Sequence, residues 1–303
     1  MDLDVWTLNT VFSKWLIYGA CAAAIGGPGI AALLLVDGST RPRVRTVLRY
    51  TGIGCAVGLL AVAANFFLQV GAFADNGLKG LFDAGIMVLL WQTAIGDALT
   101  WRVLGFSALL FLSLVVLRWP QSLASTAGRW TVSLSVLAGI GLIGTSYAAI
   151  GHSAEHGLGA RLLVVVHVLG VMWWIGALVP LWLACSAMPV VDLRVLMHRF
   201  GQFAAAVLFA LLACGVTLLV LFLRSLDEMF TTPYGLALSA KTGVVFLLLG
   251  LAALHKWRFV PRLIAPAAAL RLKTSIGIEF VLAALILALS AVLSTVLGPA
   301  GLA

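Results

Sequence analysis

Charged side chains are scarce in this 303-residue sequence. Asp, Glu, Lys and Arg make up 10% of the residues, whereas hydrophobic residues make up 62% and the mean hydropathy is +1.12. Soluble domains carry about 25% charged and about 45–50% apolar residues. A soluble fold could not cover this much apolar surface, and disordered chains are rich in charge. The composition therefore excludes both classes and predicts a protein embedded in lipid.

The sequence also lacks the alternation of apolar and polar residues that is typical of transmembrane strands. Residues 207–223, VLFALLACGVTLLVLFL, are apolar at nearly every position, and about 20 such residues cross a bilayer as a helix. We predict an all-α, polytopic membrane protein with one transmembrane domain over residues 1–303. The eight predicted spans cover residues 11–36, 45–72, 98–118, 129–150, 160–186, 199–224, 237–257 and 274–297. Two other segments, 77–95 and 226–235, are predicted to form short interfacial or re-entrant helices.

Motifs of soluble enzymes are missing. There is no G-x-x-x-x-G-K-[ST] loop for ATP, and there is no G-x-S-x-G or H-E-x-x-H motif. We therefore expect this chain to be neither an enzyme nor, by itself, an ATP-driven pump. The four cysteines lie apart in apolar segments without a C-x-x-C pair, so we predict no structural disulfide.

The formal net charge is +8, which in a soluble protein would suggest nucleic acid. Here the basic residues flank apolar spans, so we expect no nucleic-acid partner and interpret the charge as the positive-inside bias. The loops after the first, third, fifth and seventh spans hold most of it: Arg41, Arg43, Arg45, Arg49, Arg118, Arg129, Arg194, Arg199, Lys256, Arg258, Arg262, Arg271 and Lys273. The opposite side holds Lys14, Lys79, Arg102, Arg161, Arg224 and Lys241. This asymmetry predicts that both termini are periplasmic.

An internal repeat joins the two halves of the sequence. Thr93-x-x-Gly96-x-Ala98-Leu99-Thr100-x-Arg102 matches Thr232-x-x-Gly235-x-Ala237-Leu238-Ser239-x-Lys241, and each copy precedes an apolar span. Four spans separate the copies, so both have the same orientation, which is typical of a parallel repeat about an axis along the membrane normal. The possible halves are residues 1–150 and 151–303. Chance similarity between apolar segments is the alternative.

The histidines are the most informative side chains. His152 and His156 are four residues apart in GHSAEHG, so they would share one face of a helix, with Glu155 beside them. Imidazole binds Cu, Zn, Fe and Ni. These three residues are a candidate outer metal site, although two polar residues in an interfacial loop are also unremarkable.

His167 lies within a predicted span, in VVVHVLGVMWWIGAL. Ionisable residues inside spans are rare and usually face the bundle interior. His167 could bind a metal or haem, or it could be a neutral histidine with one hydrogen-bond partner. We add Met172 of the same segment to the candidate metal ligands. In a continuous helix, His156 and His167 would lie about 16 Å apart, so either the loop folds back or there are two metal stations in series.

Soft ligands gather in sequence at the predicted cytoplasmic end of this span. His167, Trp174 and Cys185 fall on one helical stripe, which could equally be ordinary packing. Thiolate and thioether ligands select Cu(I). The candidate exit site consists of Cys185, Met188, Met197 and His198.

Glu279 is buried in the last predicted span. A buried carboxylate needs a partner or a proton. We expect an ion pair with Lys273 or Arg271, with proton coupling as the alternative. His255, beside Lys256 and Arg258, is expected to be a solvated cytoplasmic histidine.

Several motifs resemble the copper resistance protein D (CopD) family of bacterial inner-membrane proteins. They are Gly151–Ala154, His167–Leu181 (the family's H-x(6)-W-x-G-x-L-x-P-L), Thr232–Lys241 (T-x-Y-G-x-x-L-x-x-K) and Arg258–Leu263 (part of N-x-x-x-x-x-P-x-L). The sequence departs from the family at His255, where many members have Asn, and at Ala177, where a second Gly is usual. The resemblance implies eight spans and copper handling, with a separate small periplasmic copper-binding protein (CopC-like) as partner.

The leading hypothesis is therefore a copper permease of the bacterial inner membrane that takes up Cu(I) or Cu(II) from the periplasm. The bound ion would pass from the outer histidines to His167 and leave near Cys185. The alternatives are a haem-binding membrane redox protein and a copper sensor or assembly factor that does not transport the ion.

Overall fold

The computed structural model describes residues 4–36, 41–150, 157–222 and 227–297. Within these residues the chain is helical and contains no strand, and eight helices are long and apolar enough to cross a membrane. These helices are α1 (Val5–Val36), α2 (Arg41–Ala74), α4 (Ala94–Arg118), α5 (Thr126–Ala149), α6 (Gly157–Ala187), α7 (Val190–Phe222), α9 (Pro233–Leu254) and α10 (Pro266–Thr295). The predicted all-α polytopic architecture with eight spans is confirmed.

Several helices extend beyond their predicted bounds. α7 begins at Val190 rather than at residue 199, and α10 begins at Pro266 rather than at residue 274. Proline is favoured in the first turn of a helix, because the N–H groups of that turn have no intrahelical acceptor and the loss of one costs no hydrogen bond. Apolar runs mark only the part of a helix that lipid covers, whereas the helix itself continues into the polar boundary. Arg194 and Lys273, predicted to lie in loops, are therefore helical.

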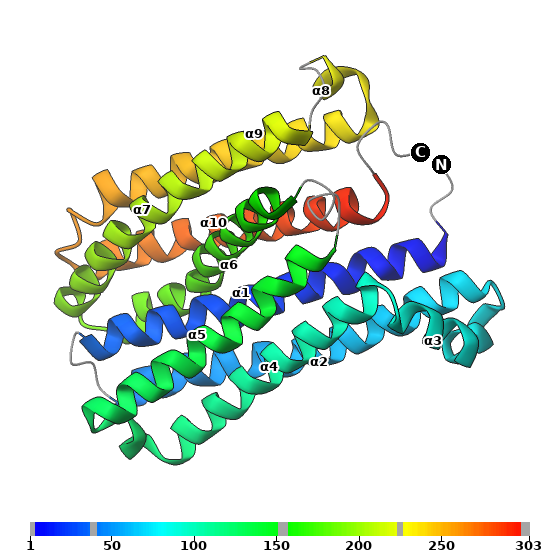
Figure 1. Ribbon diagram of the computed structural model, residues 1–303. Helices are drawn as coiled ribbons and strands as arrows, with labels where there is room; N and C mark the ends of the chain where they lie inside the picture. Colours follow the sequence, from blue (N-terminus) through cyan, green and yellow to red (C-terminus); the bar gives the residue numbers. More distant parts are fainter. Residues whose placement is uncertain (1–3, 37–40, 151–156, 223–226, 298–303) are drawn as a thin grey trace.

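Short helical segments connect the spans. The 3-10 helix η1 (Gly77–Phe82), α3 (Ala84–Trp91) and α8 (Glu228–Thr231) lie at one end of the bundle (Figure 1). The 3-10 helix η2 (Pro120–Leu123) lies at the opposite end, and a π-helical turn, η4 (His255–Phe259), follows α9. The prediction of short helices around residues 77–95 and 226–235 agrees with η1, α3 and α8.

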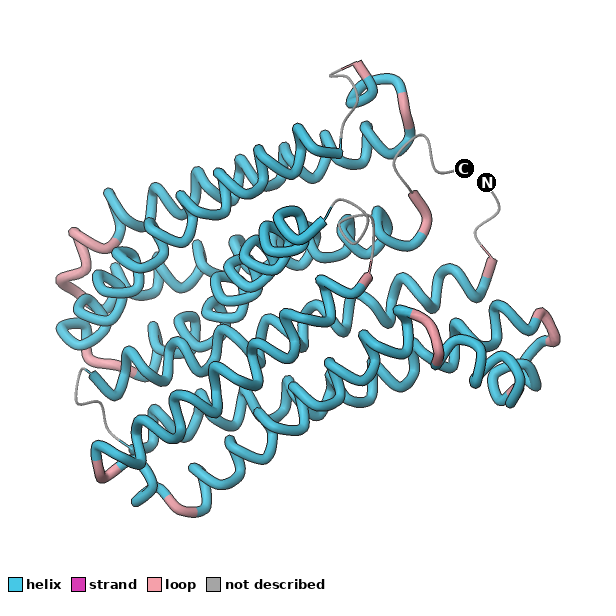
Figure 2. Tube along the Cα trace, viewed as in Figure 1, coloured by secondary structure: helices cyan, strands magenta, loops and turns pink. Residues whose placement is uncertain are grey.

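The spans run roughly parallel to one another as a single bundle (Figures 1 and 2). α1 packs against α2, α6 and α10 and is the most buried span: 61% of its apolar window is buried, compared with 6% for α9. The bundle is therefore organised around the first helix, and α9 lies at its edge.

α1 and α6 approach each other most closely at two glycines. A Cβ atom on Gly26 would overlap the backbone of Gly176, and a Cβ atom on Gly176 would overlap the backbone of Ala22. Small residues allow transmembrane helices to pack backbone against backbone. Each glycine lies about three turns before the end of its helix, and a proline follows it, Pro28 in α1 and Pro180 in α6.

Corresponding helices in the two sets α1–α5 and α6–α10 share a local feature. Thr93 caps the N-terminus of α4, and Thr232 caps that of α9; each side-chain oxygen accepts a backbone N–H. A short helix, α3 or α8, precedes each cap. The matching order of elements supports the interpretation of the sequence motif as an internal repeat.

We predict that Gly176→Ala lowers the free energy of unfolding by about 1–3 kcal/mol, because the added methyl group must separate α1 from α6. The matched control is Gly141→Ala in α5, where a Cβ atom would meet nothing within 4 Å. Alanine favours helix by about 1 kcal/mol over glycine, so the control should be neutral or stabilising. Denaturant unfolding in detergent measures both, and equal stabilities would contradict the packing argument.

Candidate functional site

His167 lies on α6 and faces α7. If Gly215 carried a Cβ atom, this atom would lie 3.6 Å from Cε1 and 3.9 Å from Nδ1 of the His167 ring, so the glycine leaves room for the imidazole. The Nδ1 atom is buried and makes no hydrogen bond of good geometry within the described residues, while the backbone carbonyl of Leu211 on α7 lies close enough to interact with the ring. A buried polar atom without a partner is costly. This nitrogen is therefore available to a ligand that approaches between α6 and α7.

The structure does not bring Met172 to the same point. Residues five apart on an α-helix point about 140° away from each other. Met172 is buried in the main apolar core, whereas His167 is half-buried against α7. Trp173, next to Met172, stacks on Phe200 of α7 with ring centroids 5.3 Å apart. Met172 and His167 therefore do not form one binding site.

The outer candidates His152, Glu155 and His156 lie in residues 151–156, outside the described residues. They follow directly after Ile150, which lines a membrane cavity. This cavity has a volume of about 540 Å³, and its lining includes Ile95 and Tyr234, in the first turns of α4 and α9.

Three basic side chains line this cavity: Lys14 of α1, Arg102 of α4 and Lys241 of α9. Two of these, Arg102 and Lys241, are the matching cations of the sequence repeat. The other polar residues that line the cavity are Tyr18, Asn65, Gln69, Tyr147, Tyr234, Ser290, Ser294 and Thr295. The described lining contains no Asp or Glu. The cavity is therefore cationic.

Neighbouring groups position two of the cations. Lys14 Nζ donates to the Ser294 carbonyl at 2.9 Å. Arg102 Nε donates to Ser146 Oγ at 3.2 Å, and its guanidinium carbon lies 5.1 Å from the centre of the Tyr147 ring. Both side chains are half-buried.

Lys241 lines the cavity and also lies near His167. Its side chain makes no hydrogen bond or ion pair within the described part of the chain, and its charge acts on the His167 ring. Val164, which lines the cavity, lies one turn before His167 on α6. His167 therefore lies beside the inner part of a cationic cavity, which sequence reasoning did not predict.

The candidate exit residues occupy the opposite end of α6 and the start of α7. Cys185 and Met197 belong to the buried apolar core and Met188 packs against it, whereas His198 is exposed. All four cysteines are free and buried. Cys185 is 18 residues after His167, or roughly 27 Å along the helix. The described residues contain no group of three or more His, Cys, Asp and Glu side chains that could hold a metal ion.

The prediction that Glu279 forms an ion pair with Lys273 or Arg271 is wrong. Its Oε2 atom lies 3.1 Å from Nδ1 of His255, and the other ring nitrogen of His255 lies 2.7 Å from Ser275 Oγ. Lys273 instead places its ammonium 4.0 Å from the centre of the Trp182 ring, and Arg271 is exposed.

The expectation that His255 is solvated is also wrong, because its side chain is only 14% exposed. His255 begins the π-helical turn η4, whose wider geometry differs from that of the preceding α9. Such turns frequently occur at functional sites. Glu279 and Ser275 are four residues apart on α10, so they share a face; this spacing is the sequence signal that could have revealed their common partner.

We predict that Glu279→Ala lowers the free energy of unfolding by about 3–5 kcal/mol, because breaking a buried pair leaves His255 without its partner. Glu279→Gln should lose less, since an amide can still hydrogen-bond to the ring. The control is Asp192→Ala, which removes an ion pair with Arg43 at 3.1 Å whose carboxylate is 49% exposed; such pairs contribute about 0–1 kcal/mol. Equal losses in Glu279→Ala and the control would contradict a structural role for the buried pair.

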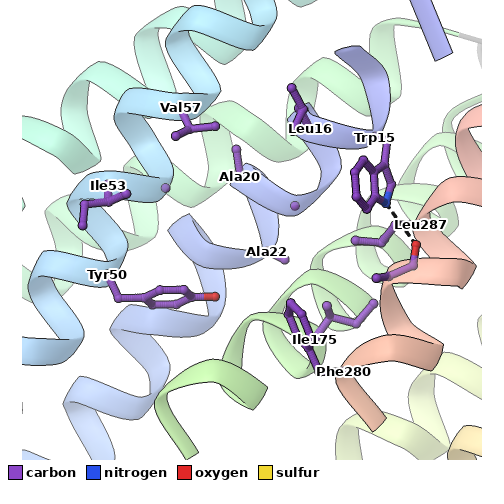
Figure 3. A pocket seen from close by; sticks show the side chains of 13 residues that line it. Trp15, Leu16, Ala20, Ala22, Tyr50, Ile53, Val57, Ile175, Phe280 and Leu287 are labelled. Atoms are coloured by element: carbon purple, nitrogen blue, oxygen red, sulfur yellow. Dashed lines mark hydrogen bonds between the residues drawn. The ribbon is translucent and has the colours of Figure 1, made fainter. Parts of the chain in front are cut away.

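A second, apolar pocket of about 270 Å³ lies between α1, α2, α6 and α10 (Figure 3). Trp15 Nε1 donates to the Ala284 carbonyl at 3.0 Å at its edge. Its lining includes Ile53, Val57 and Phe280, which are exposed on the lipid-facing surface. No His, Cys, Met or charged residue lines it, so it suits a lipid chain rather than a metal ion.

The spans and the polar cavity define a multi-pass α-helical membrane protein. The model of the family described as "Copper resistance protein D-like, N-terminal domain" matches residues 4–162, and that of "Copper resistance protein D" matches residues 194–293. The chain belongs to the copper resistance protein D family, as its motifs indicated.

Among curated proteins, the chain is similar to the "Copper transport protein CutJ" of Bacillus subtilis (strain 168). The two are 29% identical over 220 residues, which cover 70% of this chain and 39% of that protein. The chain therefore spans well under half the length of this relative. A comparison with solved structures gave no significant match.

Proposed function

We propose that the chain is a copper transport protein of the bacterial inner membrane. Membership of the copper resistance protein D family and the similarity to a copper transport protein support copper as the transported ion. The observation that carries the proposal is the buried Nδ1 atom of His167 in a membrane-spanning helix, which makes no hydrogen bond of good geometry to any residue that the structure describes. Neutral imidazole is a common metal ligand.

The proposed route has separate stations, because no single ion can contact all the candidates. Copper is captured by His152, Glu155 and His156, passes His167, and leaves near Cys185, Met188, Met197 and His198. The thiol and thioethers at the inner end favour Cu(I) over Cu(II). A separate, CopC-like periplasmic protein is the proposed donor.

Uptake is the direction that the charge of the ion favours. No nucleotide-binding motif supplies energy for export. A membrane potential that is negative inside favours inward movement of a cation by about 2.3 kcal/mol per charge per 100 mV. Import therefore needs no energy source beyond the membrane potential.

We predict that His167→Ala and His167→Asn both reduce copper uptake into proteoliposomes to the level of protein-free liposomes. The asparagine amide can make the single hydrogen bond that the imidazole would make, but the amide cannot replace the imidazole as a copper ligand. The matched control, Val166→Ala, changes the neighbouring lipid-exposed residue and should keep wild-type uptake. Wild-type flux through His167→Asn would remove His167 from the route.

The same preparations separate transport from the two alternatives. A haem-binding redox protein would show a Soret absorption band. Of the described histidines besides His167, His255 is bonded to Glu279 and Ser275, and His198 is roughly 25 Å along α7 from Gly215, the residue opposite His167. A copper sensor or assembly factor would bind copper without flux. We expect stoichiometric copper, copper flux and no Soret band.

We predict that a reporter active only in the cytoplasm, fused to Ala303, gives no signal, because the arginine-rich end of the bundle is the cytoplasmic one. The same reporter fused after truncation at Ser125, at the end of α4 and η2, should be active. A strong signal from the Ala303 fusion would reverse the orientation and, with it, the proposed direction of transport.

A further inference from the structure

The three cations of the outer cavity have an unusual environment. Lys14, Arg102 and Lys241 come from three different membrane-spanning helices and all three are half-buried. Lys14 and Arg102 repel each other electrostatically. Charges placed within a membrane domain are costly and normally pair with opposite charges.

No carboxylate offsets these charges in the described lining of the cavity. Lys14 is held by a carbonyl oxygen, Arg102 by a hydroxyl group and an aromatic ring, and Lys241 by no hydrogen bond to a described residue. These contacts orient the cations but do not neutralise their charge within the described lining. An anion inside the cavity would supply the missing charge.

The remaining lining indicates what kind of anion fits. The hydroxyl group of Tyr234 can donate a hydrogen bond to an oxygen atom of the anion, whereas Gln69 Nε2 already donates to Asn65. Val62 and Leu99 form apolar wall. The volume of about 540 Å³ falls within the range of small-molecule sites, about 300–1,000 Å³. An anion with several carboxylates on a short carbon skeleton could place one carboxylate near each of these cations.

We propose that this cavity is a binding site for a small organic polycarboxylate, with Arg102 and Lys241 as its principal partners. The planar guanidinium of Arg102 suits a carboxylate, which it can bind through two parallel hydrogen bonds. The ammonium of Lys241, which has no hydrogen-bond partner among the described residues, binds a second carboxylate, and Lys14 lies on the side of α1 and α10. The site stands independently of copper transport, because none of its residues is proposed as a metal ligand.

The experiment titrates citrate, succinate, acetate and chloride into metal-free protein in nanodiscs of zwitterionic lipid, with binding measured by calorimetry and thermal unfolding. We expect one citrate per chain, with affinity falling from citrate to succinate to acetate and no saturable binding of chloride. Arg102→Gln and Lys241→Gln should each weaken citrate binding at least about tenfold, as the loss of a charged hydrogen-bond partner predicts. Lys79→Gln, which changes an exposed lysine of η1 outside the cavity, is the matched control and should bind like wild type.

Two further measurements decide the outcome. Without any anion, Lys241→Gln should melt at a higher temperature than wild type, because an uncompensated charge has been removed. Nanodiscs with phosphatidylglycerol test whether a lipid headgroup supplies the same anionic oxygens: competition with citrate that depends on Arg102 would assign the site to lipid, and no competition would assign it to a soluble anion. Absence of citrate and lipid binding, or equal binding by wild type, Arg102→Gln and Lys241→Gln, would overturn the proposal. Because no copper is present, either result is independent of the proposed transport.

Discussion

The backbone contact between α1 and α6 at Gly26 and Gly176 is the constraint on which the rest of the bundle depends. It places the most buried helix against the first helix of the second set, and α2 and α10 then pack around this pair. In lipid, helices gain little from burying apolar side chains against each other, so close packing supplies much of the association energy. A larger side chain at either glycine would displace both sets of helices and the cavity that they enclose.

The same packing determines which charges meet inside the membrane domain. α1, α4 and α9 each contribute a cation to the lining of the cavity beside His167. A bare copper ion approaching His167 through this space would be repelled. An anion in the cavity would lower that repulsion, so the proposed anion site and the proposed copper route are compatible in electrostatic terms.

The sequence predicted the features that depend on local composition. It did not predict those that depend on side chains from different helices meeting in space. Long apolar runs were sufficient for the eight spans, although α4 and α9 begin at Ala94 and Pro233 rather than at the predicted residues 98 and 237. The partner of Glu279 was missed because charge alone favoured Lys273, whereas a π-helical turn outside the α-helical register brings His255 to α10. The cavity was missed because Lys14 belongs to no motif, although the matching positions of Arg102 and Lys241 were visible.

Pro28 and Pro180 give the crossing of α1 and α6 a mechanical property. Proline lacks the N–H group that would donate to the carbonyl four residues earlier, so the carbonyl groups of Ala24 and Gly176 have no helical donor. Both interruptions lie at the level of the glycine contact. The backbone of each helix therefore has fewer internal hydrogen bonds at the level where the two helices touch.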